Sequence, residues 1–167
     1  MNKKVILGLC SLFATSILCC GVIVFVLLYS ADLIGPKANM RVFRNTVVGY
    51  ENSTYNCIYE LSRLISSPPK REIIEDRLNL CKEESNRSLE LLAKIKSPSI
   101  ESQYFLDLTT ETLQTYKSKL EINYPRIIES KYSDTPQNEE DKNIGIENLH
   151  DSFRSSTKVF DEKYLND

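Results

Sequence analysis

The first 30 residues of the chain differ in pattern from everything that follows them. Residues 5–30 form a run of 26 residues without a charged side chain, VILGLCSLFATSILCCGVIVFVLLYS. As a helix this run would extend about 39 Å at ~1.5 Å per residue, and ~20 apolar residues suffice to cross a bilayer core. The run therefore predicts an uncleaved transmembrane signal-anchor helix, preceded by a short cytoplasmic tail of residues 1–4.

Two other interpretations of this run stay open. A cleaved secretory signal has an apolar region of ~7–15 residues that ends at small residues, whereas the exit here, Tyr29-Ser30-Ala31, carries a bulky Tyr. A lipoprotein signal would use Cys19 or Cys20, yet ten more uncharged residues follow Cys20. Basic residues flank the run on both sides, so the charges alone do not fix its direction across the membrane.

Amphipathic stripes at helical spacing fill the chain beyond Gly35-Pro36, which belongs to a predicted hinge at residues 31–38. Pro-containing breaks at residues 66–69 and 97–99 and a polar loop at residues 133–143 separate the stripes. Pro125 lies inside the third stripe and predicts that this helix kinks or ends near Asn123. The apolar stripes extend over Met40–Ile65, Ile74–Ile95, Leu106–Ile127 and Ile146–Tyr164.

These four stripes predict an all-α fold. One N-terminal transmembrane helix is followed, over residues 39–167, by an antiparallel up-down helical bundle of about four helices. A long rod or a coiled-coil dimer would use the same spacing, but Pro at each break argues against one continuous rod. Ser97 or Ser99 is positioned to cap the third helix.

Two cysteines, Cys57 and Cys81, lie beyond the apolar run, and their midpoint is residue 69 in the Pro68-Pro69 turn. In an antiparallel hairpin, residues equidistant from the turn face each other, and both cysteines fall on apolar stripes. We therefore expect a disulfide, which needs Cα atoms within ~7 Å; two buried free thiols are the alternative. A disulfide implies an oxidising compartment, which would place the bundle outside the cytoplasm.

Charge and composition argue against several function classes. Only Lys3 and Lys4 are charged before Asp32, so the rest of the chain carries 19 basic residues against 23 acidic ones, without a basic patch for nucleic acid. The chain has one His, His150, and no Gly-rich phosphate loop. Glu147-x-x-His150 has the spacing of bundle metal sites, but such sites need a second copy of the motif. We expect a surface His, no metal or cofactor, and no catalysis.

Nine tyrosines are the chain's most distinctive excess. Tyr55, Tyr59, Tyr104 and Tyr132 are candidates for a partner-binding surface, because a Tyr ring and hydroxyl serve both apolar and polar contacts. The alternative is that Tyr lines the edge of a narrow core with its hydroxyl in water.

The pattern favours a membrane-tethered binding or scaffolding module that is non-catalytic and acts through a protein partner. Two alternatives share this architecture. One is a small-ligand sensor that works with a partner membrane protein and uses a cavity near Ser85 and Ser88. The other is an immunity-like neutralising protein. The expected partners are the lipid bilayer and an envelope protein, with a homodimer as a further option and no nucleic acid.

Overall fold

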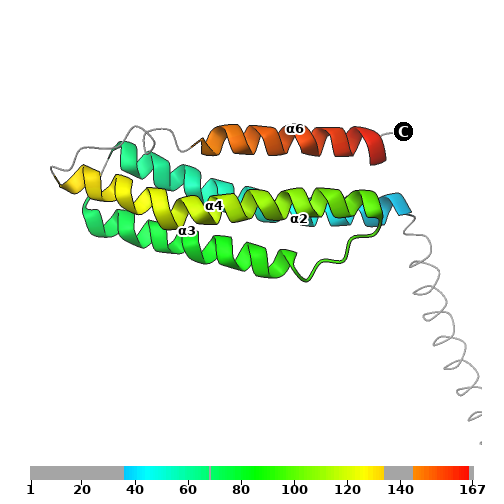
Figure 1. Ribbon diagram of the computed structural model, residues 1–167, viewed down its shortest axis with the longest axis horizontal. Coiled ribbons are helices and arrows are strands. Elements are labelled where there is room, and N and C mark those ends of the chain that lie inside the picture. The colour runs from blue at the N-terminus through cyan, green and yellow to red at the C-terminus, as the bar shows by residue number, and fades with distance from the viewer. Residues whose placement is uncertain (1–35, 68, 134–144, 166–167) are drawn as a thin grey trace, which may run out of the picture. The chain divides into compact units, whose positions relative to one another are not determined.

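The computed structural model describes residues 36–67, 69–133 and 145–165, and in these ranges every regular element is a helix. The four helices are α2 (Pro36–Ser66), α3 (Arg71–Leu92), α4 (Ile100–Tyr132) and α6 (Ile146–Tyr164) (Figure 1). The prediction of an all-α bundle is confirmed. The predicted membrane segment, residues 5–30, lies outside the described residues, and none of the four helices is long and apolar enough to cross a bilayer.

Successive helices run antiparallel. Thr54 and Cys57 on α2 meet Ser88 and Cys81 on α3, so residue numbers rise on one helix as they fall on the other. The order is also reversed between α2 and α6, where Arg44 pairs with Asp161. By contrast, α2 and α4 run parallel. Figure 1 shows the resulting bundle, in which α2 and α4 both begin at the end where α6 finishes.

The core follows from the apolar stripes of the four helices. A layer of Phe rings closes the end of the bundle at which α4 begins, where the Phe105 ring lies 4.6 Å from the Phe160 ring and 5.8 Å from the Phe153 ring. Phe43 of α2 joins the layer at 6.4 Å from Phe160. The apolar side chains with no exposed surface include Val47, Ile58, Leu61, Ile74, Cys81, Leu113 and Leu120.

The start of α4 is fixed by a capping box. The Ser102 backbone N–H donates to Ser99 Oγ at 3.2 Å, and the Ser99 backbone N–H donates to Ser102 Oγ at 2.9 Å. These reciprocal bonds satisfy two donors that a helix otherwise leaves open at its start. Of the two predicted caps, Ser99 is the residue used.

Of the two outcomes predicted at Pro125, a helix end near Asn123 is wrong, because α4 continues through Pro125 to Tyr132; a kink there stays a prediction. Pro inside a helix costs about 3 kcal/mol. Continuing the helix buries Tyr124, Ile127 and Ile128, and each large apolar side chain contributes about 1.5–3 kcal/mol when buried. Burial therefore outweighs the lost backbone hydrogen bond.

The predicted hinge at residues 31–38 also needs a correction at its end. Helix α2 begins at Pro36, so residues 36–38 are helical, in agreement with the preference for Pro in a first helical turn. Residues 31–35 lie outside the described residues. Of the predicted loop 133–143, Ser133 is described and follows the end of α4.

Cys57 and Cys81 form the predicted disulfide, with their Cα atoms 5.5 Å apart. Cys81 is completely buried and Cys57 is partly buried against the core. The bond joins the second half of α2 to the middle of α3 and holds the two helices in one register.

Replacing both cysteines by Ser should lower the free energy of unfolding by about 3 kcal/mol, because the disulfide closes a loop of 24 residues. The measurement is urea denaturation of the purified chain in detergent, followed by circular dichroism. Reductant should lower the wild type to the level of the Cys57→Ser/Cys81→Ser variant and leave the variant unchanged. Equal stability of the oxidised wild type and the variant would contradict the expectation.

Candidate functional site

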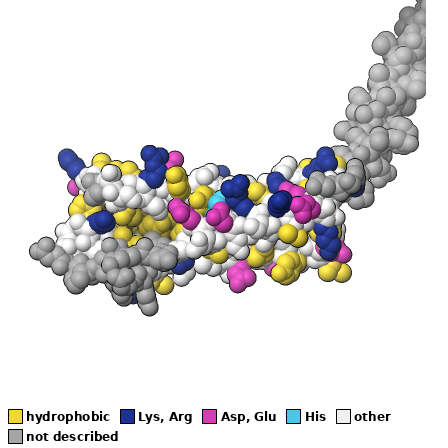
Figure 2. Space-filling model, turned by 90° about the horizontal axis from the view of Figure 1, so that it is seen from above, with side chains coloured by type: hydrophobic (Ala, Val, Ile, Leu, Met, Phe, Trp, Pro, Cys, Tyr) yellow, Lys and Arg dark blue, Asp and Glu magenta, His cyan; other side chains and the backbone are white. Residues whose placement is uncertain are grey.

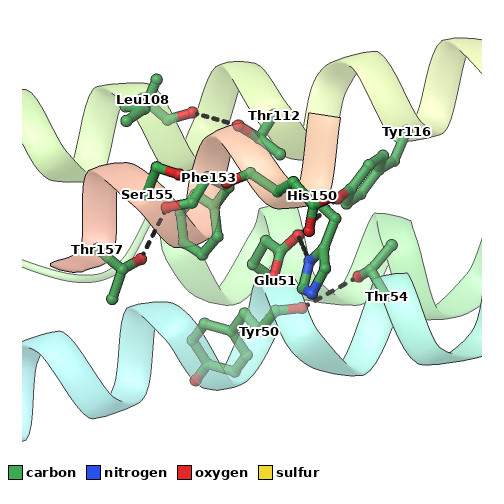
Figure 3. A network of polar contacts seen from close by, with 11 residues as sticks. Tyr50, Glu51, Thr54, Leu108, Thr112, Tyr116, His150, Phe153, Ser155 and Thr157 are labelled. Atoms are coloured by element: carbon green, nitrogen blue, oxygen red, sulfur yellow. Dashed lines mark hydrogen bonds and ion pairs between the residues drawn. The ribbon is translucent and has the colours of Figure 1, made fainter. Parts of the chain in front are cut away.

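The most unusual feature inside the bundle is a cluster of three polar side chains from three helices. Glu51 comes from α2, Tyr116 from α4 and His150 from α6, and they point toward one another (Figure 3). The Tyr116 hydroxyl donates to Glu51 Oε1 at 2.6 Å, and His150 Nδ1 lies 3.0 Å from the same oxygen. Glu51 and Tyr116 have no exposed surface, and His150 is 8% exposed.

Each of these residues occupies a core position of its own helix. Glu51 follows Val47 by one helical turn, so its side chain lies on the buried stripe. His150 lies between the buried residues Ile146 and Phe153 in the same way. The expectation of a surface His is therefore wrong. Its spacing from Ile146 and Phe153 is the sequence signal that indicates burial.

The environment favours the neutral form of the carboxyl group. Burial raises the pKa of Glu51 above its ordinary value, and this effect outweighs the hydrogen bonds from His150 and Tyr116, which lower the pKa. Burial and the neighbouring Glu51 raise the pKa of Tyr116 in turn, which keeps the phenol protonated as a donor. Within the described part of the chain, Glu51 Oε2 is buried without a hydrogen-bond partner. An ionised carboxylate is costly in such a place.

Tyr55 separates the cluster from solvent. Its ring stacks on the His150 imidazole, with centroids 3.6 Å apart and planes within 5° of parallel. Tyr59 continues the stack at 6.2 Å from Tyr55. Desolvation raises the pKa of Tyr55, and the nearby Glu147 and Asp151 carboxylates raise it further. In Figure 2 only a small patch of the chain's one His is visible.

The chemistry open to this cluster is that of an enclosed hydrogen-bond network. A carboxylate and an imidazole form the orienting half of a nucleophilic triad, but the other group held here, Tyr116, bonds to the carboxylate and has a strongly raised pKa. Glu147 and His150, which have the spacing of a bundle metal site, point in different directions. The Glu147 side chain is exposed, whereas His150 points inward toward Glu51. No three His, Cys, Asp or Glu side chains in the described ranges converge as metal ligands.

A second polar cluster lies between α2 and α3. Thr54 Oγ1 lies 3.1 Å from Ser88 Oγ and 3.2 Å from the Tyr50 carbonyl oxygen, so its single proton has two acceptors within hydrogen-bond distance. Ser88 Oγ lies 3.4 Å from the same carbonyl. Ser85, one turn away, is completely buried, and its hydroxyl has no partner among the described residues. The polar groups of Thr54 and Ser88 are therefore bonded within the helix pair.

The four tyrosines expected to form a partner surface lie in three separate places. Tyr55 and Tyr59 stack beside His150. Tyr132 is half-buried at the end of α4, where its hydroxyl donates to the Pro69 carbonyl oxygen at 2.5 Å. Tyr104 is 75% exposed in the second turn of α4. Tyr116 and Tyr124, in contrast, are buried with bonded hydroxyls, Tyr124 to Ser62 at 2.7 Å.

Tyr104 borders a surface groove between α4 and α6 that the sequence pattern did not predict. The groove has a volume of about 430 Å³. Ser155 and Ser156 in its wall donate their hydroxyls to carbonyl oxygens of α6 itself, at 2.9 and 3.1 Å, so these side chains need no further partner. The groove is lined by Glu101, Tyr104, Phe105, Leu108, Ser152, Ser155, Ser156, Val159, Phe160, Lys163 and Tyr164.

The buried carboxyl group should make stability depend on pH. The folded-state pKa of Glu51 lies above its ordinary value of 4.5, so the fold favours the protonated form. Its contribution to stability is complete below pH 4.5 and is lost as the pH rises through the raised folded-state pKa. We expect the free energy of unfolding to fall over that window in the wild type and to change less in Glu51→Gln, measured by urea denaturation at each pH.

The matched control is Glu111→Gln, because Glu111 is an exposed carboxylate on α4. This variant should retain the wild-type pH profile. Glu51→Ala should lower the free energy of unfolding by about 1–3 kcal/mol, since it leaves the buried Tyr116 hydroxyl without its acceptor. Identical pH profiles for the wild type and Glu51→Gln would contradict the raised pKa.

Comparisons with known proteins identify no relative for this chain. No protein-family model matches it, and neither a curated protein nor a solved structure is significantly similar to it. The function must therefore be argued from the chain's own residues and their arrangement.

Proposed function

We propose that the chain is a membrane-tethered binding module outside the cytoplasm, that it catalyses no reaction, and that it acts by engaging a protein partner at the α4–α6 groove. The observation that carries this proposal is the groove itself. It combines an apolar lining with two prominent apolar side chains at its border, Tyr104 at 75% and Val159 at 62% exposure. Exposed apolar surface of this kind is typical of interaction sites.

The groove favours an apolar helix face as the occupant. It lies between two helices, and its wall on α6 presents the small residues Ser152, Ser155 and Ser156, which let another backbone approach closely. The hydroxyls of Ser155 and Ser156 are already bonded to their own helix, so an apolar partner side chain would leave neither of them unsatisfied. Lys163 and Glu101 provide polar contacts at the groove's border.

The tether and the compartment support the same proposal. Residues 5–30, without a charge, have the length and composition of a transmembrane signal-anchor. The Cys57–Cys81 disulfide is typical of oxidising compartments. A tether confines the bundle to a layer next to the membrane, which raises the local concentration of a partner that is also membrane-borne.

The absence of catalysis is supported by the enclosure of the polar cluster. Glu51 and Tyr116 have no exposed surface, and Tyr55 covers His150. A substrate would have to displace packed aromatic rings to reach these groups. We assign the cluster the role of fixing α2, α4 and α6 in the one arrangement that forms the groove.

In-cell photocrosslinking tests the groove. A photoreactive Phe analogue at position 104 should give one discrete adduct with a protein other than this chain. A Val159→Lys substitution in the same molecule should reduce its yield at least several-fold, because a charge then lies at the groove's border. The matched control places the analogue at Ile122, which is 49% exposed on the same helix but outside the groove.

Three outcomes would contradict the proposal. The first is the same adduct from positions 104 and 122, and the second is no adduct from position 104. The third is an adduct of twice the chain's mass, which would indicate a homodimer at this surface. Circular dichroism of Val159→Lys should match the wild type, since Val159 is 62% exposed and contributes little to the core.

A further inference from the structure

The connection between α3 and α4 ends at an apolar residue whose side chain contributes little to the fold. Ile100, the first residue of α4, is 89% exposed, more than any other large hydrophobic residue in the described ranges. Lys94 and Lys96 precede it and are exposed, while Ile95 between them packs against the core. The connection and the first residue of α4 therefore expose two ammonium groups and one isoleucine within seven residues of the chain.

This arrangement is held rigidly. The capping box of Ser99 and Ser102 fixes the residue before Ile100. Ser97 Oγ donates to the Ser99 carbonyl oxygen at 2.6 Å and lies 2.6 Å from Ser102 Oγ. The Ile95 backbone N–H donates to the Leu92 carbonyl oxygen at 3.0 Å. A connection so fully bonded presents Ile100 in one position and loses little conformational entropy on contact with a surface.

The connection lies at the end of the bundle where α2 begins. Phe43 near the start of α2 and Phe105 near the start of α4 both pack on Phe160, and Figure 1 shows α2 and α4 beginning at the same end of the bundle. Only residues 31–35 separate the uncharged run from Pro36. At ~3.3–3.6 Å per residue such a linker spans at most about 20 Å.

We propose that this end of the bundle contacts the membrane surface, with Ile100 inserted among the lipid headgroups and Lys94 and Lys96 paired with anionic headgroups. The inference rests on the proposed membrane tether. A bilayer is favoured over a protein because Ile100 projects from a short connection and is not among the residues that line the groove. An exposed apolar side chain that follows two exposed lysines suits contact with an anionic membrane interface.

Nearby charges are compatible with an anionic surface. Lys163 in the last turn of α6 is exposed at the same end. Asp161 is neutralised by its ion pair with Arg44. Glu101 follows Ile100, and backbone and Ser99 hydrogen bonds lower its pKa, so it remains ionised. Glu162, beside Lys163, lies 3.8 Å from the ammonium group of Lys158. Lys94, Lys96 and Lys163 therefore outnumber Glu101.

The absence of Trp from the chain provides a direct test. The full-length chain with Ile100→Trp is reconstituted into vesicles of phosphatidylcholine with 30% phosphatidylglycerol, in which brominated acyl chains quench nearby Trp. We expect blue-shifted emission and several-fold stronger quenching than for Ile122→Trp, the exposed control on the same helix. Adding Lys94→Glu and Lys96→Glu should reduce the quenching of Ile100→Trp toward that of the control.

Equal quenching of the two Trp variants would overturn the inference, as would quenching of Ile100→Trp that is the same in pure phosphatidylcholine vesicles. Flotation of the unmodified chain with vesicles after an alkaline carbonate wash separates this failure from that of the tether. A chain that floats while its Ile100→Trp remains unquenched contradicts only the headgroup contact. A chain that does not float contradicts the membrane tether of the proposed function.

Discussion

The register between α2 and α3 is the constraint on which the rest of the bundle depends. The Cys57–Cys81 disulfide joins the two helices, and the Thr54–Ser88 hydrogen bond connects them again, one turn earlier on α2 and about two turns later on α3. Because an antiparallel pair cannot slide without moving every facing residue, this alignment fixes which face of α2 is left for α4 and α6. Glu51, on that face, then meets Tyr116 and His150.

The buried cluster contributes specificity rather than net stability. Burial raises the pKa of Glu51 despite two hydrogen bonds. The desolvation cost of the ionised carboxylate is therefore larger than the stabilisation that its hydrogen-bond partners provide. Apolar side chains in place of all three residues would remove that cost, but they would pack equally well in other rotations of the helices. A single acceptor that both Tyr116 and His150 must reach permits one arrangement. That arrangement brings the α6 wall of serines beside Tyr104 and so forms the groove.

Local patterns in the sequence predicted the helices, the hairpin, the disulfide and a cap at Ser97 or Ser99, because spacing along one or two neighbouring helices determines each of them. A helix end at Pro125 was wrongly allowed because burial of Tyr124, Ile127 and Ile128 is a property of the whole bundle. His150 was misjudged because its partner, Glu51, is 99 residues away. The groove was missed because Ser155 and Ser156 count as polar in a sequence, although their hydroxyls are already bonded within α6.

Thiol labelling in intact cells tests most directly the central claim, that the disulfide-bonded bundle lies outside the cytoplasm. In a chain whose Cys10, Cys19 and Cys20 are replaced by Ala, only Cys57 and Cys81 remain. The account predicts no reaction with a membrane-impermeant maleimide until an impermeant phosphine reductant is added, and then labelling of both residues. Labelling without reductant, and only by a membrane-permeant maleimide, would place free thiols in the cytoplasm and contradict the account.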